Sequence, residues 1–283
     1  MRSYEDQVEL PSGGGLDFSG PALVMAIVNC NEDSFFPSSR AMAALAVEKA
    51  LAAEEDGAAI VDFGGESTRP GSEYIDAEEE LRRLIPVIEA FRKRSKLPVS
   101  VDTRKTAVAR AALDAGADIV NDISALEDEG MALLCAERGA AVVLMHMKGQ
   151  PRTMQDAPVY QDVVSEVGAF LLSAAERALA AGIAKEKIIL DPGIGFGKRT
   201  VDNLSLLAYL AEIRLKGYPM LVGLSRKSFI GEICGRELSE RLAGTIAANA
   251  AAIMAGADII RVHDVRQGVD LAALLYAIRK VKR

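Results

Sequence analysis

The sequence of 283 residues contains no tryptophan, two histidines and three cysteines. Cys30, Cys135 and Cys234 form no C-x-x-C pair, so we expect free thiols in a reducing cytoplasm and no disulfide framework. The two histidines, His146 and His263, lie far apart, without an H-E-x-x-H segment or a Cys/His cluster, and no G-x-S-x-G segment occurs. These absences argue against a zinc hydrolase and a serine hydrolase.

Long apolar runs and a positive charge balance are also absent. No uninterrupted apolar stretch of membrane-spanning length occurs, and residues 1–20 are polar and Gly-rich, so neither a membrane span nor a signal peptide is expected. The net charge of −7 and the lack of a basic run argue against nucleic acid as the main partner. With 50% hydrophobic and 26% charged residues, the chain can bury a sizeable core, and its length suits one large α/β domain or, less well, two small ones. An anionic small ligand stays open, because local Arg and Lys residues decide it.

A short unit recurs along the chain. The segment Gly-Ala-Ala-Ile-Val at 57–61 returns in related form at 116–120, 139–143 and 256–260. Each copy follows an Ala-rich helical stretch and opens a short β-branched run. We interpret the glycine as the residue just after a helix, followed by a buried parallel strand.

These anchors predict eight strands separated by helices, the pattern of an α/β (β/α)8 TIM barrel. The predicted strands are Leu23–Val28, Ile60–Phe63, Val99–Val101, Ile119–Val120, Val142–Met145, Ile188–Leu190, Met220–Gly223 and Ile259–Val262. Predicted helices include Glu78–Arg94, Val163–Ala181 and Glu240–Ala255. An open doubly wound sheet is the rival, but no G-x-G-x-x-G follows the first strand. We expect residues 1–20 to form an arm or hairpin under the barrel and residues 21–283 to form a single domain.

Acceptor-bearing side chains end several of the predicted strands. Asp102, Asn121 and Asp191 each follow an otherwise apolar run. A buried carboxylate is costly unless it is paired, so convergence of these groups at the barrel mouth suits a flat heterocycle that carries several N–H donors. Lys227 can supply a donor from the other side of such a ring.

A second set of side chains is cationic. Arg69 follows the second strand and Arg261 and His263 follow the eighth, and both strands should flank the first strand in a barrel. Together with Thr68 and Asn29, this set suits a phosphate or pyrophosphate. The alternatives are that Arg261 pairs with Asp264 or a helix carboxylate, and that His263 is structural.

No obvious general base accompanies these groups. A site of positioning residues without a base suits displacement of a good leaving group, such as pyrophosphate with Mg²⁺ on its oxygens.

At these residues the sequence resembles the dihydropteroate synthase family. The matching segments, in order, are DFGGESTRPG (62–71), SVDT (100–103), VND (120–122), LMHM (144–147), LDPGIGFGK (190–198), GLSRKSF (223–229) and RVHDV (261–265). The resemblance implies a TIM barrel, usually a homodimer, that condenses 6-hydroxymethyl-7,8-dihydropterin pyrophosphate with p-aminobenzoate. The implied mechanism is SN1-like: pyrophosphate leaves and the amine attacks the pterin cation.

The resemblance also implies residue roles. The pterin is held by Asp102, Asn121, Asp191 and Lys227. The pyrophosphate is held by Asn29, Thr68, Arg69, Arg261 and His263, with Asn29 near Mg²⁺. The p-aminobenzoate is held by Thr68, Pro70, Phe196 and Ser228, where Ser228 lies at a predicted helix start that favours an anion. Lys227, Arg261 and Asp33 are the residues expected to act in catalysis.

The loop after the first strand departs from the family pattern. Asn29, Asp33, Ser34 and Phe35 keep their places, but the usual Thr-Pro pair is replaced by Asn31-Glu32. We therefore expect this loop to close differently, and hypothesise that Asp33 still stabilises the pterin cation. Two other functions are kept as alternatives: a pterin-binding methyltetrahydrofolate:corrinoid methyltransferase, and a non-catalytic pterin-binding paralogue.

Overall fold

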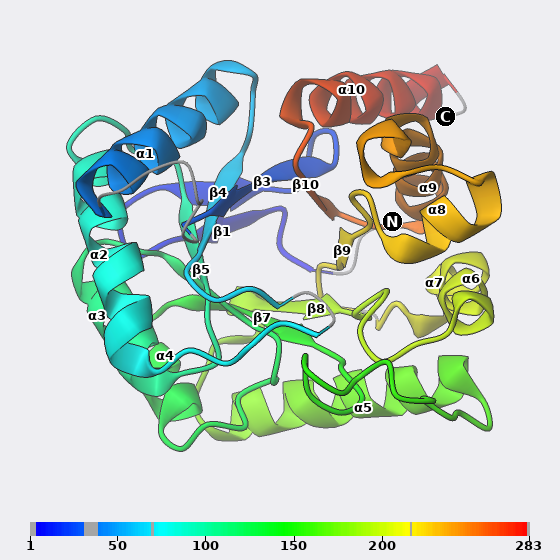
Figure 1. Cartoon of the computed structure of the whole chain (residues 1–283), viewed down its shortest axis with the longest axis horizontal. Helices are drawn as coiled ribbons and strands as arrows, with labels where there is room; N and C mark the ends of the chain where they lie inside the picture. Colours follow the sequence, from blue (N-terminus) through cyan, green and yellow to red (C-terminus); the bar gives the residue numbers. More distant parts are fainter. Residues whose placement is uncertain (1–3, 31–38, 69–70, 216, 282–283) are drawn as a thin grey trace.

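The computed structural model describes residues 4–30, 39–68, 71–215 and 217–281, whose strands form a barrel inside a ring of helices (Figure 1). The barrel strands are β3 (Leu23–Asn29), β4 (Ile60–Gly64), β5 (Val99–Asp102), β6 (Ile119–Asp122), β7 (Ala141–Met145), β8 (Ile188–Asp191), β9 (Leu221–Gly223) and β10 (Ile259–Val262). The helices are α1 (Ser39–Glu55), α2 (Ala77–Arg92), α3 (Thr106–Asp114), α4 (Met131–Arg138), α5 (Val163–Ala180), α6 (Thr200–Ala208), α7 (Leu210–Ile213), α8 (Ser228–Cys234), α9 (Leu242–Ala255) and α10 (Val265–Val281), with short 3₁₀ turns at Lys185–Lys187 and Leu238–Glu240.

All neighbouring barrel strands run parallel, in the order β8-β7-β6-β5-β4-β3-β10-β9. A parallel bridge between Leu190 and Met220 joins the two end strands and closes the ring. The predicted TIM barrel is therefore confirmed, and the predicted strands agree with the observed ones within two residues. The helix predicted from Glu240 begins instead at Leu242, after a 3₁₀ turn.

The recurring glycines end helices as the repeat predicted. Gly57, Gly116, Gly139 and Gly256 have φ of 94°, 105°, 60° and 111°, a left-handed conformation that favours glycine. The residue after each glycine donates its N–H to a carbonyl five residues earlier, as in Ala117 to Ala112 at 2.8 Å. This pattern satisfies the last carbonyls of each helix and turns the chain into the next strand.

An N-terminal hairpin covers the bottom of the barrel. Strands β1 (Gln7–Glu9) and β2 (Gly15–Asp17) pair antiparallel, and Leu16 and Phe18 are buried against the inward-facing residues at the start of the barrel strands. The backbone N–H of Ser12 donates to Asp118 at 3.0 Å, which fastens the hairpin turn to the barrel. Each large apolar side chain buried here contributes about 1.5–3 kcal/mol. The predicted hairpin under the barrel is confirmed.

The interior of the barrel changes from apolar to polar along several of the strands. Ile60, Ile119 and Ile259 form part of the buried lower layer. Because side chains alternate across a strand, the residues two positions further on face the same interior. Those residues include Asp62 after Ile60, and by the same rule Asn121, Asp191 and Arg261 share the upper layer. The fold thus places charged groups over an apolar floor.

In the described part of the chain, none of the helices has the length and apolar character needed to cross a bilayer.

Candidate active site

A cavity of about 890 Å³ opens at the carboxyl ends of the barrel strands. Parallel strands of a closed barrel deliver their carboxyl ends to one mouth, which is why residues far apart in sequence meet there. The predicted site residues that line it are Asn29, Thr68, Asp102, Asn121, Asp191, Phe196, Lys227, Ser228, Arg261 and His263. Asp33, Arg69 and Pro70 lie outside the described residues. The shared location of the ten is observed, whereas the role of each stays a prediction.

Arg261 lies at the centre of a charged network inside the cavity. Its Nε donates to Asp62 at 2.6 Å and its Nη2 donates to Asp102 at 2.8 Å. Asp62 also accepts a hydrogen bond from the Nδ2 of Asn121 at 3.1 Å. The network therefore joins the predicted acceptor set to the predicted cationic set. Asp264, the alternative partner for Arg261, pairs instead with Arg226 at 2.7 Å.

Asp102 and Asp191 are acceptors at the wall of the cavity. Burial raises the pKa of Asp102 to about 7, against the opposing effect of the Arg261 charge. Burial likewise raises the pKa of Asp191 to about 6, although the N–H of Gly193 donates to it at 2.7 Å. The Oδ1 of Asp102 is buried and has no hydrogen-bond partner among the described residues. A buried acceptor without a partner is expensive, so this oxygen fits a ligand that brings an N–H donor.

Lys227 faces this acceptor wall from the loop before α8. Its Nζ lies 4.0 Å from the centre of the Phe196 ring, in the geometry of a cation–π contact. Burial lowers the pKa of Lys227 to about 8, while the Asp191 carboxylate acts in the opposite direction. The preceding residue, Arg226, has a φ of 56°, and its N–H donates to Thr245 at 3.0 Å. This tight turn directs Lys227 into the cavity.

The cationic side of the cavity lies where three strands meet. β10 pairs with β3, and β3 pairs with β4, so the second and eighth barrel strands flank the first as predicted. The Nδ1 of His263 lies 2.9 Å from the hydroxyl of Ser225 on the neighbouring loop. Asn29 ends β3 and Thr68 follows β4. These groups surround Arg261 with hydrogen-bonding side chains suited to an anion.

Known proteins resemble the chain over nearly its whole length. A family model described as "Pterin binding enzyme" matches residues 25–263. Dihydropteroate synthase of Escherichia coli (strain K12) is 47% identical over 271 residues, covering 95% of this chain and 96% of that protein. The crystal structure of Yersinia pestis dihydropteroate synthase with a sulfonamide drug has a TM-score of 0.91 and 41% identity, covering 97% of this chain and 99% of that one. The chain belongs to the dihydropteroate synthase family.

A further member of the family was solved in two complexes. Xanthomonas albilineans dihydropteroate synthase with 4-aminobenzoic acid has a TM-score of 0.90 and 45% identity, covering 97% of this chain and 98% of that one. The same organism's enzyme in complex with 7,8-dihydropteroate has a TM-score of 0.86 and 41% identity, covering 97% of this chain and 99% of that one.

The sequence analysis did not identify two charged residues that shape the candidate active site. Asp62 was treated only as part of a motif, although it is fully buried and holds both Arg261 and Asn121. A charge in the middle of an apolar strand was the signal that could have identified it. Lys198 was also treated only as part of a motif, yet it is 2% exposed and lies directly behind the loop that carries Phe196.

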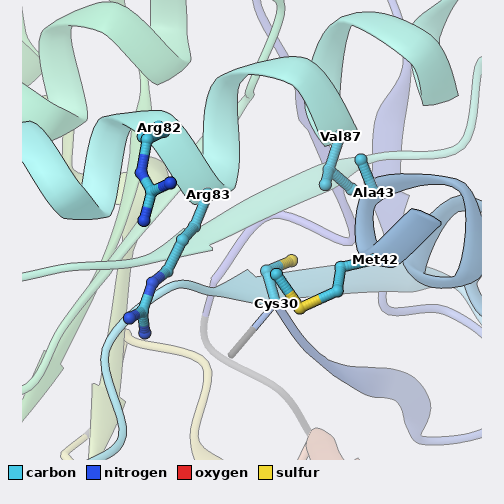
Figure 2. Close-up of a pocket in the computed structure, with 6 residues that line it drawn as sticks. All are labelled: Cys30, Met42, Ala43, Arg82, Arg83 and Val87. Carbon is cyan, nitrogen blue, oxygen red and sulfur yellow. The ribbon is translucent and has the colours of Figure 1, made fainter. Parts of the chain in front are cut away.

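A second, much smaller hollow lies at the seam between α1 and α2 (Figure 2). Its volume of about 10 Å³ suits no more than a water molecule. It is lined by Cys30, Met42, Ala43, Arg82, Arg83 and Val87. Burial raises the pKa of the Cys30 thiol to about 12, so this thiol stays protonated and unreactive. Arg83 donates to the carbonyl of Gly65 at 3.2 Å, which ties α2 to the loop after β4.

Proposed function

We propose that this protein condenses 6-hydroxymethyl-7,8-dihydropterin pyrophosphate with p-aminobenzoate to give 7,8-dihydropteroate and pyrophosphate. The observation that carries the proposal is the placement of the Arg261 network and Lys227 in one cavity with Asp102, Asn121 and Asp191. The kinship with the E. coli dihydropteroate synthase supports the same reaction.

In this proposal the pterin lies against Asp102, Asn121, Asp191 and Lys227. The two carboxylates accept N–H bonds from the amino-bearing edge of the ring, and Lys227 donates to a ring carbonyl or nitrogen. The Oδ1 of Asp102, for which the described residues offer no hydrogen-bond partner, supports this orientation. Because Lys227 is half-buried and the carboxylates are buried, little of their own surface is open to water that would compete for these bonds.

The pyrophosphate is assigned to Arg261, His263, Asn29, Thr68 and Arg69. The bond between the pterin methylene carbon and the bridging oxygen breaks, and its electron pair leaves with pyrophosphate. Positive groups around the oxygens stabilise the charge that develops there. The amine lone pair of p-aminobenzoate then forms the new C–N bond, after which the nitrogen loses a proton. We assign Asp33 to stabilisation of the intermediate pterin cation, and an Asp33→Asn variant with unchanged kcat would contradict that role.

The p-aminobenzoate is assigned to Thr68, Pro70, Phe196 and Ser228. Its ring would lie along Phe196, and its carboxylate would face the backbone N–H groups at the start of α8, where Ser228 is exposed. This placement leaves the amine directed at the pterin methylene carbon.

We also propose Mg²⁺ as the cofactor, held by Asn29 together with the pyrophosphate oxygens. Mg²⁺ prefers oxygen ligands and commonly binds through one or two side chains plus substrate phosphates. The described residues contain no cluster of three His, Cys, Asp or Glu side chains that could hold a metal alone, so the substrate would supply most of the ligands. The ion would neutralise charge on the departing pyrophosphate, and the amide oxygen available at Asn29 fits that task.

A cytoplasmic homodimer is the proposed state of the protein. Cys30, Cys135 and Cys234 are all free thiols, as expected in a reducing compartment. Exposed apolar side chains on α6, α9 and α10, such as Leu204, Met254 and Leu274, supply surface for self-association. Light scattering of the purified protein tests the dimer directly, and a monomer at micromolar concentration would contradict it.

Pyrophosphate release by the purified protein tests the reaction. The assay contains the dihydropterin pyrophosphate and Mg²⁺, with or without p-aminobenzoate, and the pteroate product is identified by mass. The proposal predicts equal amounts of pyrophosphate and dihydropteroate, with little release when Lys227→Ala replaces the wild type. Tight pterin binding without product would favour the non-catalytic paralogue, and methyl transfer to a corrinoid protein would favour the methyltransferase alternative.

A further inference from the structure

Lys198 is a buried basic side chain outside the proposed substrate contacts. Its side chain is 2% exposed, and its Nζ lies at the junction of the loops that follow β7 and β8. Four acceptors surround this nitrogen. They are the Nδ1 of His146 at 2.9 Å and the carbonyl oxygens of His146, Gly193 and Phe196 at 3.2, 2.9 and 3.0 Å.

The two loops approach each other too closely for side chains at the contact. A Cβ on Gly193 would lie 1.9 Å from the carbonyl oxygen of His146, and one on Gly197 would lie 2.2 Å from the carbonyl oxygen of Lys148. Several carbonyl oxygens therefore face the same small space. An ammonium group offers three N–H donors and no acceptor, so it satisfies such a site where a neutral apolar side chain would leave buried acceptors without partners.

His146 completes the set of acceptors. Burial lowers its pKa to about 3, and the Lys198 charge acts in the same direction. The imidazole is therefore neutral at physiological pH and can accept a hydrogen bond from Lys198 at Nδ1. Its ring also packs edge-on against Phe170, with 4.8 Å between ring centres. His146 is therefore also held by Phe170 of α5, and its fixed ring fixes the position of Lys198.

The loop held by Lys198 also forms a wall of the cavity. The carbonyl of Phe196 accepts from Lys198, while the ring of the same residue lies 4.0 Å from the Nζ of Lys227. The N–H of Gly195 donates to Asn203 at 2.7 Å, and its carbonyl accepts from Gln155 at 2.8 Å. Among these three side chains, Lys198 is the one that bonds to the Phe196 backbone itself, whose N–H also donates to the carbonyl of Gly193 at 3.0 Å.

From these contacts we infer that Lys198 is a positioning residue for p-aminobenzoate: it fixes the Phe196 ring against Lys227 and so determines the aromatic wall of that subsite. The inference rests on the proposed contact between Phe196 and p-aminobenzoate. The pterin residues Asp102 and Asn121 belong to other strands. Asp191 is linked to Lys198 through Gly193, whose N–H donates to Asp191 at 2.7 Å and whose carbonyl accepts from Lys198 at 2.9 Å. The larger effect should therefore fall on p-aminobenzoate.

The test compares Lys198→Met with wild type in steady-state kinetics and pterin binding. We expect KM for p-aminobenzoate to rise about tenfold, since small misplacement of a positioning group can cost up to about 100-fold. The dissociation constant of the pterin pyrophosphate should change by less than about threefold. Lys187→Met is the matched control, because Lys187 also donates to two backbone carbonyls, Glu9 and Gly139, but at the bottom of the barrel. This control should leave both constants unchanged.

A double-mutant cycle of Lys198→Met and Phe196→Ala tests the role of Lys198 separately from the proposed contact between Phe196 and p-aminobenzoate. If Lys198 acts through Phe196, the double variant should bind p-aminobenzoate no more weakly than Phe196→Ala alone. A wild-type KM for Phe196→Ala would overturn the proposed Phe196 contact itself. A raised KM for Phe196→Ala with a wild-type KM for Lys198→Met would overturn only the inference. If Lys198→Met does not fold, Lys198→Gln replaces it, because the glutamine amide keeps two N–H donors for the buried carbonyls. This variant should raise KM for p-aminobenzoate. An unchanged KM for p-aminobenzoate would overturn the inference.

Discussion

Asp62→Asn is the substitution that most directly probes the charged network. Asp62 is fully buried, accepts from Arg261 at 2.6 Å and from Asn121 at 3.1 Å, and reaches no further cation in the described residues. The asparagine keeps the shape of the side chain but removes its charge. It can still accept a hydrogen bond, so the substitution changes the strength of the contacts rather than the packing.

The expected magnitude follows from the bond to Arg261. A hydrogen bond to a charged group contributes about 1.5–3 kcal/mol. If that energy holds Arg261 in its catalytic position, kcat/KM for the pterin substrate should fall about 10- to 160-fold. The free energy of unfolding should fall by about 1–3 kcal/mol, because Asp102 still pairs with Arg261 at 2.8 Å and the cation keeps one partner.

Steady-state kinetics with both substrates varied, together with urea unfolding, measures the two effects. Asp118→Asn is the matched control, since Asp118 is also fully buried and pairs with Arg92, but it lies below the apolar layer, where it accepts from Ser12. This control should lose stability and keep kcat/KM. The reasoning is refuted if Asp62→Asn retains wild-type kcat/KM, or if Asp118→Asn loses activity to the same degree.

Three further substitutions, a pH profile and one control substitution in α5 test other parts of the structure. Lys227→Ala should lower kcat/KM at least about tenfold, or about 1.4 kcal/mol of transition-state stabilisation, and a wild-type value would mean that the lysine does not act on substrate. With the pKa of Asp102 raised to about 7 and that of Lys227 lowered to about 8, binding of a pterin without pyrophosphate should weaken below about pH 7, as the carboxylate takes up a proton, and above about pH 8, as the ammonium loses one. Asp102→Asn should move the acid limb down to about pH 6, the pKa of Asp191, and an acid limb that stays at about pH 7 would assign it to another group. Gly193→Ala should lower the free energy of unfolding by at least about 2 kcal/mol in urea titration, because its Cβ would lie 1.9 Å from the carbonyl oxygen of His146 at a φ of +64°. Gly168→Ala, in α5 with nothing within 4 Å, should instead stabilise by about 0.5–1 kcal/mol, and equal effects of the two would contradict the steric argument.

The sequence by itself determined the barrel fold and most of the residues that line the candidate active site. Helices that end in glycine and short apolar strands can each be recognised from neighbouring residues alone. Their alternation, eight times along the chain, is compatible with few topologies other than a barrel. Once the barrel is assumed, the residue after each strand must face the mouth. That is why Asp102, Asn121 and Asp191 could be assigned to one cavity before any distance was known.

Only the tertiary structure decided which charges pair. Arg261 binds Asp62 and Asp102, which lie 199 and 159 residues away in the chain, rather than the nearby Asp264. The four acceptors around Lys198 come from two loops whose approach depends on packing within fractions of an ångström. Periodicity fixes the side of a strand on which a residue lies, but the choice of partner depends on the reach and rotamer of long side chains in three dimensions.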